Sequence, residues 1–182
     1  MDLVGSLPPG GQKGHNACLV IADRYRKTPI FLQFHQDDTA MDTVLLIGNK
    51  VISHTGLFKN IISNRYPRFN SNLWTNFNKC LGTKLSFLTT YHQQTDGLVE
   101  IMIQNLEDMI RRLYAYSKDL ESYKVFRNDL CENIPYLELT YKTSIHDSTG
   151  KSHSKLEKGW NFKLPVDTLK KIKGRGLEIE AY

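Results

Sequence analysis

The sequence predicts an α/β fold in which a mixed sheet of five strands has helices packed on both faces. Short apolar runs typical of strands come first, and later runs alternate with segments that have the apolar period of a helix. The predicted order is three strands, helix, strand, helix, strand, helix, which fits a sheet covered by helices. At 182 residues with 40% hydrophobic side chains, the chain is long enough for one domain with its own core.

The first three strands are predicted at residues 1–4, 17–23 and 28–34. Residues 17–23, ACLVIAD, are a continuous apolar run suited to a central strand. The charged turn at residues 24–27 favours a hairpin between this strand and the next. With the first segment, the hairpin predicts an antiparallel meander.

The first helix is predicted from Thr39 to Gly56. Thr39 and Asp42 have the spacing of a capping box, and Gly56 is a typical residue to end a helix. A fourth strand is expected at residues 60–63.

A second helix is expected after Asn70 or Ser71, either of which is a good N-cap, and Gly82 ends it. Its apolar face holds Leu73, Trp74, Phe77 and Leu81. A fifth strand follows at residues 84–89. Trp74 and Trp160 are both interpreted as packing residues.

The longest helix is predicted from Asp96 or Gly97 to about Tyr116, with Asp96 as its cap. Its buried stripe consists of Val99, Met102, Leu106, Met109, Ile110 and Leu113, and a polar face carries Glu100, Gln104, Glu107 and Arg111. Glu100 therefore faces away from the core and is free to meet a ligand or a metal ion.

Beyond this helix, residues 119–129 are expected to be a loop and residues 130–145 another helix despite Pro135. A Thr-Gly turn then precedes a short helix. We expect one domain at residues 1–169, shortened at its N-terminal edge, and a loosely ordered tail at residues 170–182.

Composition narrows the class of protein. A net charge of +5 favours a polyanionic partner such as nucleic acid. Three widely separated cysteines, Cys18, Cys80 and Cys131, indicate free, buried thiols in a reducing compartment, without a disulfide framework or a zinc module. No apolar run reaches 18 residues and no signal peptide opens the chain, so a soluble protein of the nucleus or cytoplasm is expected, with no membrane partner and no secretion.

Acidic side chains at strand ends and at a helix start suggest metal-dependent phosphodiester chemistry. Two or three such carboxylates can hold two Mg²⁺ ions about 4 Å apart, one activating the attacking oxygen and one stabilising the leaving oxygen. Asp2 and Glu100 lie at such places, with Asn64 at the end of the fourth strand, and 35 residues separate Asn64 from Glu100. By itself this spacing is weak support, because the chain has 19 acidic residues.

The segments MDLVGSLP, LVIADRYRK, SNRYPRF, YHQQTDGLVE and TYKTSIHDSTG, in this order, resemble the integrase cores of retroviruses and of gypsy-type LTR retrotransposons. The resemblance implies a ribonuclease-H-like three-layer fold that uses Mg²⁺ or Mn²⁺ for 3′-end processing and strand transfer of retroelement DNA ends into target DNA. It also implies a possible homodimer. Asp2, Asn64 and Glu100 match the three catalytic, metal-binding positions.

The same resemblance implies that residues 90–97 are a loop that approaches DNA, with His92, Gln94 and Thr95 as the contact residues. His92 is more often a surface histidine in such a place, so no proton transfer is assigned to it.

Departures from the family pattern predict an enzyme that is inactive or nearly so. The second catalytic aspartate of the family is Asn64 here, which leaves a neutral amide in place of a carboxylate. Gln93 replaces a loop proline, and Ile101 and Ile103 replace polar residues, so Ile101 should expose apolar surface. The zinc-binding and C-terminal DNA-binding modules of the family are also not recognisable.

Plainer interpretations stay open beside this one. Asp2 could be a solvated residue near a terminus, Glu100 an ordinary first-turn glutamate favoured by the helix dipole, and Asn64 a turn residue. The whole chain could be a non-catalytic nucleic-acid-binding or assembly module, or an inert retroelement fragment.

Overall fold

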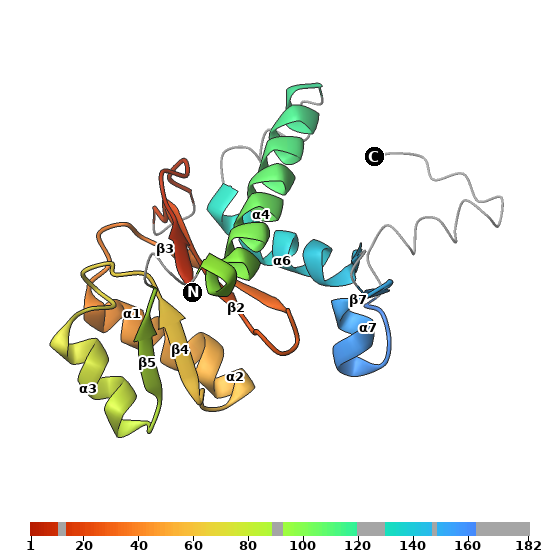
Figure 1. Cartoon of the computed structure of the whole chain (residues 1–182). Helices are drawn as coiled ribbons and strands as arrows, with labels where there is room; N and C mark the ends of the chain where they lie inside the picture. Colours follow the sequence, from red (N-terminus) through yellow and green to blue (C-terminus); the bar gives the residue numbers. More distant parts are fainter. Residues whose placement is uncertain (11–13, 89–92, 120–129, 147–148, 163–182) are drawn as a thin grey trace. The chain divides into compact units, whose positions relative to one another are not determined.

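The computed structural model describes the chain except for residues 11–13, 89–92, 120–129, 147–148 and 163–182, and it leaves out the side chains of 93–96, 114, 116–119 and 130. The chain divides into two compact units, residues 1–141 and 142–182. Figure 1 shows the elements of both. Each unit is described by itself.

An antiparallel meander opens the first unit, as predicted. Strands β1 (Asp2–Val4), β2 (Ala17–Ala22) and β3 (Pro29–Phe34) form one sheet in the order β1-β2-β3. Asp2 lies opposite Val20 in the register of β1 and β2. All residues of β2 up to Val20 are fully buried, which agrees with a central strand covered on both faces.

Residues near the end of the unit bind β3. Glu138 of α6 (Ile134–Thr143) accepts a hydrogen bond from the backbone N of Phe31 at 2.7 Å, and the side chain of Gln33 donates to the carbonyl of Cys131 at 2.7 Å. Cys131 belongs to a short 3₁₀ segment, η3 (Leu130–Asn133). The bond to Glu138 occupies a backbone N–H that an added strand would need, which disfavours edge-to-edge pairing there. The helix predicted over 130–145 is thus a 3₁₀ turn followed by α6, and it ends at Thr143.

The helix predicted from Thr39 to Gly56 is present in three consecutive segments. They are α1 (Ala40–Ile47), the π-helical η1 (Gly48–Ile52) and α2 (Ser53–Thr55). The Thr39 and Asp42 side chains form the predicted capping box, and hydrogen bonds from Thr39 lower the pKa of Asp42. Gly56 ends the helical stretch at a φ of 80°, a value that favours glycine.

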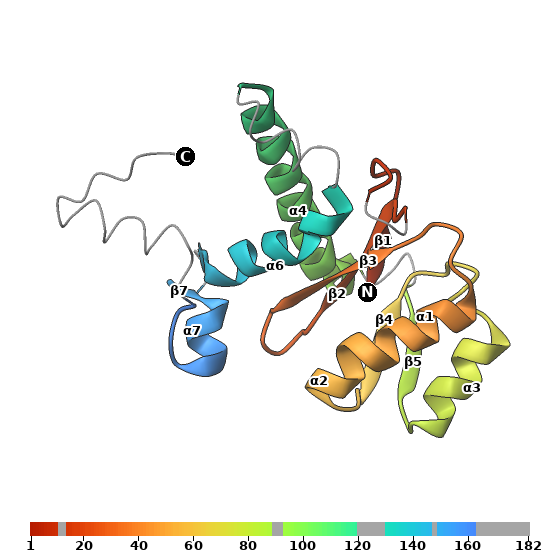
Figure 2. The same ribbon diagram turned by 180° about the vertical axis from the view of Figure 1, so that it is seen from behind.

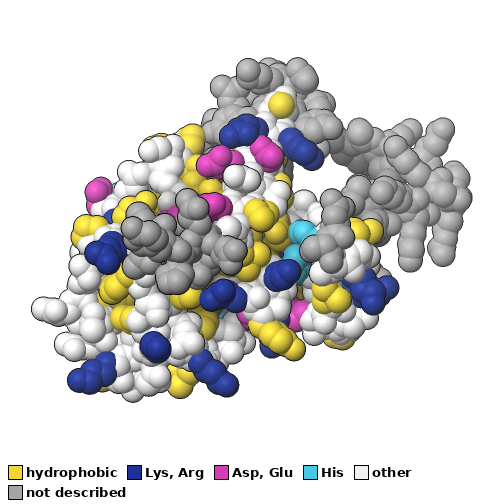
Figure 3. All heavy atoms as spheres, in the orientation of Figure 1, with side chains coloured by type: hydrophobic (Ala, Val, Ile, Leu, Met, Phe, Trp, Pro, Cys, Tyr) yellow, Lys and Arg dark blue, Asp and Glu magenta, His cyan; other side chains and the backbone are white. Residues whose placement is uncertain are grey.

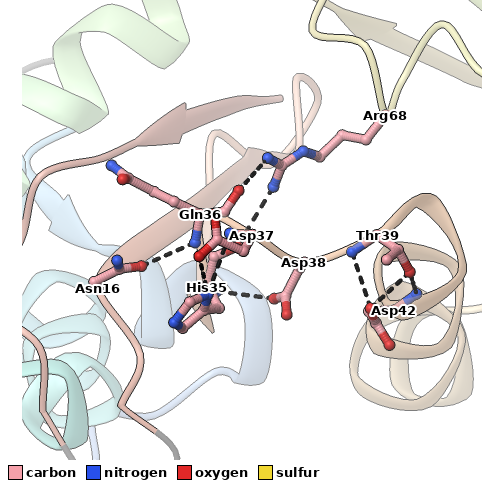
Figure 4. A network of polar contacts seen from close by, with 8 residues as sticks. All are labelled: Asn16, His35, Gln36, Asp37, Asp38, Thr39, Asp42 and Arg68. Carbon is pink, nitrogen blue, oxygen red and sulfur yellow. Dashed lines mark hydrogen bonds and ion pairs between the residues drawn. The ribbon is translucent and has the colours of Figure 1, made fainter.

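The connection that leads into α1 is fixed by the polar network of Figure 4. Asp38 accepts a hydrogen bond from the backbone N of His35 at 2.8 Å. The guanidinium of Arg68 donates to the carbonyl of Gln36 at 2.6 Å and lies 4.9 Å from the ring centroid of Phe34. Arg68 comes from the loop after β4, so the network ties two connections together.

Strands β4 (Asn60–Ser63) and β5 (Lys84–Phe87) pair in parallel, with α3 (Asn72–Cys80) between them in the chain. Ser71 is the N-cap of α3 and accepts a hydrogen bond from the backbone N of Trp74 at 3.1 Å. Trp74 is fully buried, as predicted. In the view of Figure 2, α1 and α2 lie in front of β4 and β5.

The described residues do not show the predicted five-stranded sheet. The described residues form sheets of three, two and two strands. A hydrogen bond from the N-terminal amine of Met1 to the carbonyl of Ile62 at 2.6 Å joins the start of β1 to β4. A continuous ladder requires repeated backbone pairs along both strands, and no such ladder is formed between β1 and β4 among the described residues.

The longest helix, α4, runs from Gln93 to Asp119. Asp96 therefore lies within the helix and is not its cap, which corrects the predicted start. Val99, Met102, Leu106 and Ile110 are buried against β2 and α6 in one core cluster. A second cluster on the other face joins Leu19, Phe34, Ile47, Ile61 and Trp74. Helices thus cover both faces of the strands, as expected.

The second unit is small. It contains the short pair β6 (Ile145–His146) and β7 (Lys151–Ser152), followed by α7 (His153–Lys158). Thr149 and Gly150 form the predicted turn. Trp160 is 62% exposed, so its interpretation as a packing residue was wrong. The tail expected at 170–182 lies outside the described residues, and the boundary at 169 stays a prediction.

Candidate active site

Asp2 and Asn64, which are far apart in the sequence, lie in direct contact. Asp2 is the first residue of β1, and Asn64 follows the last residue of β4. The side-chain amide of Asn64 donates a hydrogen bond from Nδ2 to Oδ1 of Asp2. The same carboxylate oxygen accepts a bond from the backbone N of Leu3 at 2.7 Å. The structure thus brings together two of the three predicted site residues.

Two features of the fold place Asn64 beside Asp2. The hydrogen bond between Met1 and Ile62 holds the start of β1 beside the end of β4. Four residues past Asn64, Arg68 anchors the loop to Gln36 (Figure 4). The backbone is thus anchored both before Asn64, at Ile62, and after it, at Arg68.

The other end of the Asn64 amide is unsatisfied. Its Oδ1 is buried and has no hydrogen-bond partner among the described residues. The amide nitrogen of Asn64 donates hydrogen bonds, whereas its oxygen only accepts them. The Asp2 carboxylate can only accept, so it favours the amide orientation in which the N–H faces it. An aspartate at this position could not make that bond without a proton or a cation between the two carboxylates.

Glu100 lies on α4, one residue after Val99. Val99 and Met1 line the same cavity, so this part of α4 is near the start of β1. The Glu100 side chain is exposed, and no hydrogen bond or ion pair joins it to another described residue. Ile101 beside it is 55% exposed, as predicted. The structure brings the helix to the site without a contact between the Glu100 carboxylate and Asp2 or Asn64.

The predicted DNA contacts cannot be placed by their side chains. His92 lies outside the described residues. Gln94 and Thr95 lie in α4, so the expected loop at residues 90–97 is helical from Gln93 onward. The side chains of Gln94 and Thr95 are not described. All three stay predictions.

The present donor set does not fit a pair of divalent cations. Mg²⁺ prefers several oxygen ligands in near-octahedral geometry. Here Asn64 offers an N–H donor to Asp2 instead of an oxygen, and within the described part of the chain no three His, Cys, Asp or Glu side chains are grouped to hold a metal ion. The neutral amide at position 64 is one cause, and the absence of a contact from Glu100 is another.

Charge around the site is modest. Sequence reasoning did not single out Arg65, yet it is exposed and follows Asn64 directly, so it carries a cation next to the site. Its position beside Asn64 in the sequence is the signal that could have found it. On the face in Figure 3, Lys and Arg side chains are scattered among neutral and hydrophobic ones. Among the residues described on that face, the basic side chains form no continuous patch.

Comparison with solved structures defines the class of fold. The chain is similar to the catalytic core domain of BIV integrase, with a TM-score of 0.59, 16% identity and coverage of 97% of both chains. It is also similar to the HTLV-2 integrase catalytic core domain in complex with magnesium, with a TM-score of 0.58, 18% identity and coverage of 85% of this chain and 93% of the other. The fold of this chain is therefore that of an integrase catalytic core, which confirms the expected class.

Among curated proteins, the chain is similar to the Transposon Tf2-3 polyprotein of Schizosaccharomyces pombe, with 28% identity over 149 residues. This match covers 82% of the chain and 10% of the polyprotein. The Tf2-4 polyprotein of the same organism matches to the same extent. The chain thus spans about a tenth of the length of the curated relatives it matches. No protein-family profile matches the chain.

In the part of the chain that the structure describes, none of the helices combines the length and the apolar character needed to cross a membrane.

Proposed function

We propose that this chain is the catalytic core of a gypsy-type LTR retrotransposon integrase in which the phosphodiester chemistry is impaired. The likeness to Tf2 polyproteins and the integrase-core fold support the descent. The contact between Asp2 and the neutral amide of Asn64 is the observation that supports impaired chemistry. In an active core, the first position would bind metal together with a second carboxylate, whereas here it accepts a hydrogen bond from a neutral group.

The expected loss of rate follows from the lost charge. At an effective dielectric constant near 20, one charge contact a few Å from a cation is worth on the order of several kcal/mol. As lost transition-state stabilisation, this amounts to roughly a thousandfold or more in rate. Asp2 and Glu100 remain as the two carboxylates of the ancestral set, and the proposed substrates are retroelement DNA ends and target DNA in the nucleus.

A strand-transfer assay tests this proposal. The unmodified chain, Asn64→Asp, and Asn64→Asp combined with Glu100→Gln would be compared with Mg²⁺ and with Mn²⁺. We expect negligible product from the unmodified chain, a measurable gain for Asn64→Asp, and loss of that gain in the double variant. The double variant is the matched control, because it keeps the new carboxylate and removes another.

Robust strand transfer by the unmodified chain would contradict the proposed impairment. A gain in Asn64→Asp that survives Glu100→Gln would show that Glu100 has no part in the site.

A second candidate is a nucleic-acid-binding or assembly module without chemistry. The exposed Arg65 beside a site blocked for metal favours it. DNA binding measured between about 50 and 200 mM salt would test this, since affinity for phosphates falls steeply with salt. Arg65→Ala should weaken binding and reduce the salt slope, whereas Lys50→Ala, on η1, is the control. Negligible binding at both salt concentrations would leave an inert retroelement fragment.

A further inference from the structure

The turn between β2 and β3 presents an exposed aromatic side chain among cations. It consists of residues 24–27, Arg-Tyr-Arg-Lys, and all four side chains are exposed. Tyr25 is 95% exposed. Figures 1 and 2 both show the turn extending past the ends of β2 and β3. We call residues 24–27 the hairpin tip.

Hydrogen bonds hold the backbone of the hairpin tip. The backbone N of Asp23 donates to the carbonyl of Thr28 at 3.0 Å, which closes the turn at its base. The Asp23 carboxylate accepts a hydrogen bond from the backbone N of Tyr25 at 2.9 Å and another from that of Arg26 at 3.1 Å. A ligand of the tip would therefore meet a backbone that is already ordered, which favours binding.

Lys27 has a backbone conformation that favours glycine. Its φ is 53°, and side chains of L-residues rarely tolerate a positive φ. A glycine would relieve this strain, so the local backbone does not explain a lysine here. Strained residues of this kind cluster at binding sites, where the side chain has a use. The strain thus points to a role for the cation itself.

The hairpin tip is positively charged. It carries three cations, and Asp23 is the one acidic residue in the segment from 23 to 28. The Asp23 carboxylate already accepts two backbone hydrogen bonds and lies 3.9 Å from the Arg26 guanidinium. Within the described part of the chain, no acidic side chain forms an ion pair with Arg24 or Lys27. These two cations are thus available to bind phosphates.

The side chains of the tip fit single-stranded nucleic acid better than other polyanions. An exposed aromatic ring can stack on a base while neighbouring cations bind phosphates of the same strand. Bases in a duplex are already stacked on one another, so a base must be unpaired to offer its face to the ring at no cost in unstacking. Tyr25 is also the one apolar side chain of the tip, which is too little apolar surface for insertion into a membrane.

We propose that the hairpin tip binds single-stranded nucleic acid, with Tyr25 stacked on an unpaired base and the three cations bound to adjoining phosphates. This site is separate from the one in the proposed function. Asp2 lies opposite Val20 in the register of β1 and β2, and the tip starts four residues further along, at Arg24. At about 3.3 Å per residue, the tip begins roughly 13 Å from Asp2.

The probe is a fluorescein-labelled oligodeoxythymidylate about twelve nucleotides long, within the usual range of single-strand sites. Fluorescence anisotropy would measure its binding to the full chain at several salt concentrations. The matched control probe is an abasic strand with the same number of phosphates, and a duplex of the same length is a second control. Tyr25→Ala and Tyr25→Phe test the ring, Lys27→Gly tests the strained cation, and Lys79→Gln, on α3, is the control variant.

We expect Tyr25→Ala to weaken binding of the oligothymidylate at least about fivefold and Tyr25→Phe to change it less than about twofold, because stacking needs a ring. The parent chain should bind the abasic strand and the duplex more weakly than the oligothymidylate. Tyr25→Ala should not weaken binding of the abasic strand.

Lys27→Gly separates binding from stability. It should lower the slope of log K against log salt by about 0.7, the value for one phosphate contact on a single strand. The same variant should not lower Tm, because glycine relieves the positive φ. Lys79→Gln should leave the salt slope unchanged.

Two further variants separate this proposal from the proposed function. Asn64→Asp and Arg65→Ala should both bind the oligothymidylate as the parent chain does. A failure of Asn64→Asp in strand transfer would then leave the hairpin site standing, and a failure of Tyr25→Ala to weaken binding would leave the proposed impairment standing.

Equal binding of the oligothymidylate and the abasic strand would indicate simple attraction between charges and overturn the proposal. So would a duplex that binds as tightly as the single strand, or a Tyr25→Ala variant that binds as the parent chain does. An absence of binding up to about 1 mM oligonucleotide, above the usual range for non-specific sites, would also overturn it.

Discussion

Asn64→Asp should destabilise the protein when no divalent cation is present. In the parent chain, the amide of Asn64 donates to the carboxylate of Asp2. The substitution replaces this attraction with two carboxylates in contact. At about 4 Å and an effective dielectric constant near 20, two unit charges of like sign repel by about 4 kcal/mol.

Two effects limit this penalty. Protonating one carboxyl group of ordinary acidity at pH 7 costs about 4 kcal/mol, so the repulsion cannot exceed that amount. Both side chains are also only half-buried, and solvent screens them. We therefore expect a loss of about 2 kcal/mol in the free energy of unfolding at pH 7, or roughly 4–8 °C in Tm. The loss should shrink towards pH 4, because one of the two carboxyl groups is then readily protonated.

Thermal unfolding followed by circular dichroism in EDTA and in Mg²⁺ measures both effects. Mg²⁺ should recover much of the loss in Asn64→Asp and change the parent chain little, since the variant regains a carboxylate that binds cations. Asn76→Asp, on the exposed surface of α3, is the control for adding a charge elsewhere. If Asn64→Asp is as stable as the parent in EDTA at pH 7, or if Mg²⁺ shifts all three proteins equally, the reasoning about this pair is wrong.

Three further expectations concern stability and thiol reactivity. Burial, with Cys131 and Glu138 nearby, raises the pKa of the Cys18 thiol in the folded protein, so this thiol ionises first in the unfolded chain. The free energy of unfolding should therefore fall above about pH 8.5, by up to about 1.4 kcal/mol per pH unit. In denaturant titrations, Cys18→Ala should flatten that slope. Cys80 is exposed, so the expectation of a buried thiol was wrong there. A thiol reagent should modify Cys80 rapidly and the buried Cys18 and Cys131 only on unfolding, and fast reaction at all three would contradict the burial. Ser71→Ala should cost about 1 kcal/mol by chemical denaturation and Ser71→Gly only a few tenths, and equal losses would show that the cap hydrogen bond to Trp74 is not the cause.

Local signals in the sequence predicted most elements correctly. The capping box at Thr39, the end at Gly56 and the N-cap at Ser71 depend on residues a few positions apart, so the sequence shows them directly. The buried stripe of α4 followed from helical period alone, and Val99 and Leu106 are indeed buried. The start of α4 was wrong, because helix ends are weakly specified when several polar residues could serve as caps.

The predictions that failed concern contacts between residues far apart in the sequence. Apolar runs identify strands but do not show which edges meet. Five strands were therefore expected in one sheet, whereas the described strands form sheets of three, two and two. Trp160 was interpreted as a packing residue, yet it is exposed.

The sequence by itself determined that position 64 carries a neutral side chain, and that Asp2 and Glu100 carry charge. Only the tertiary structure decided that the amide of Asn64 would donate to Asp2. The physical reason is that charge and hydrogen-bonding capacity belong to each residue, whereas a contact between residues 62 positions apart depends on how the strands pack.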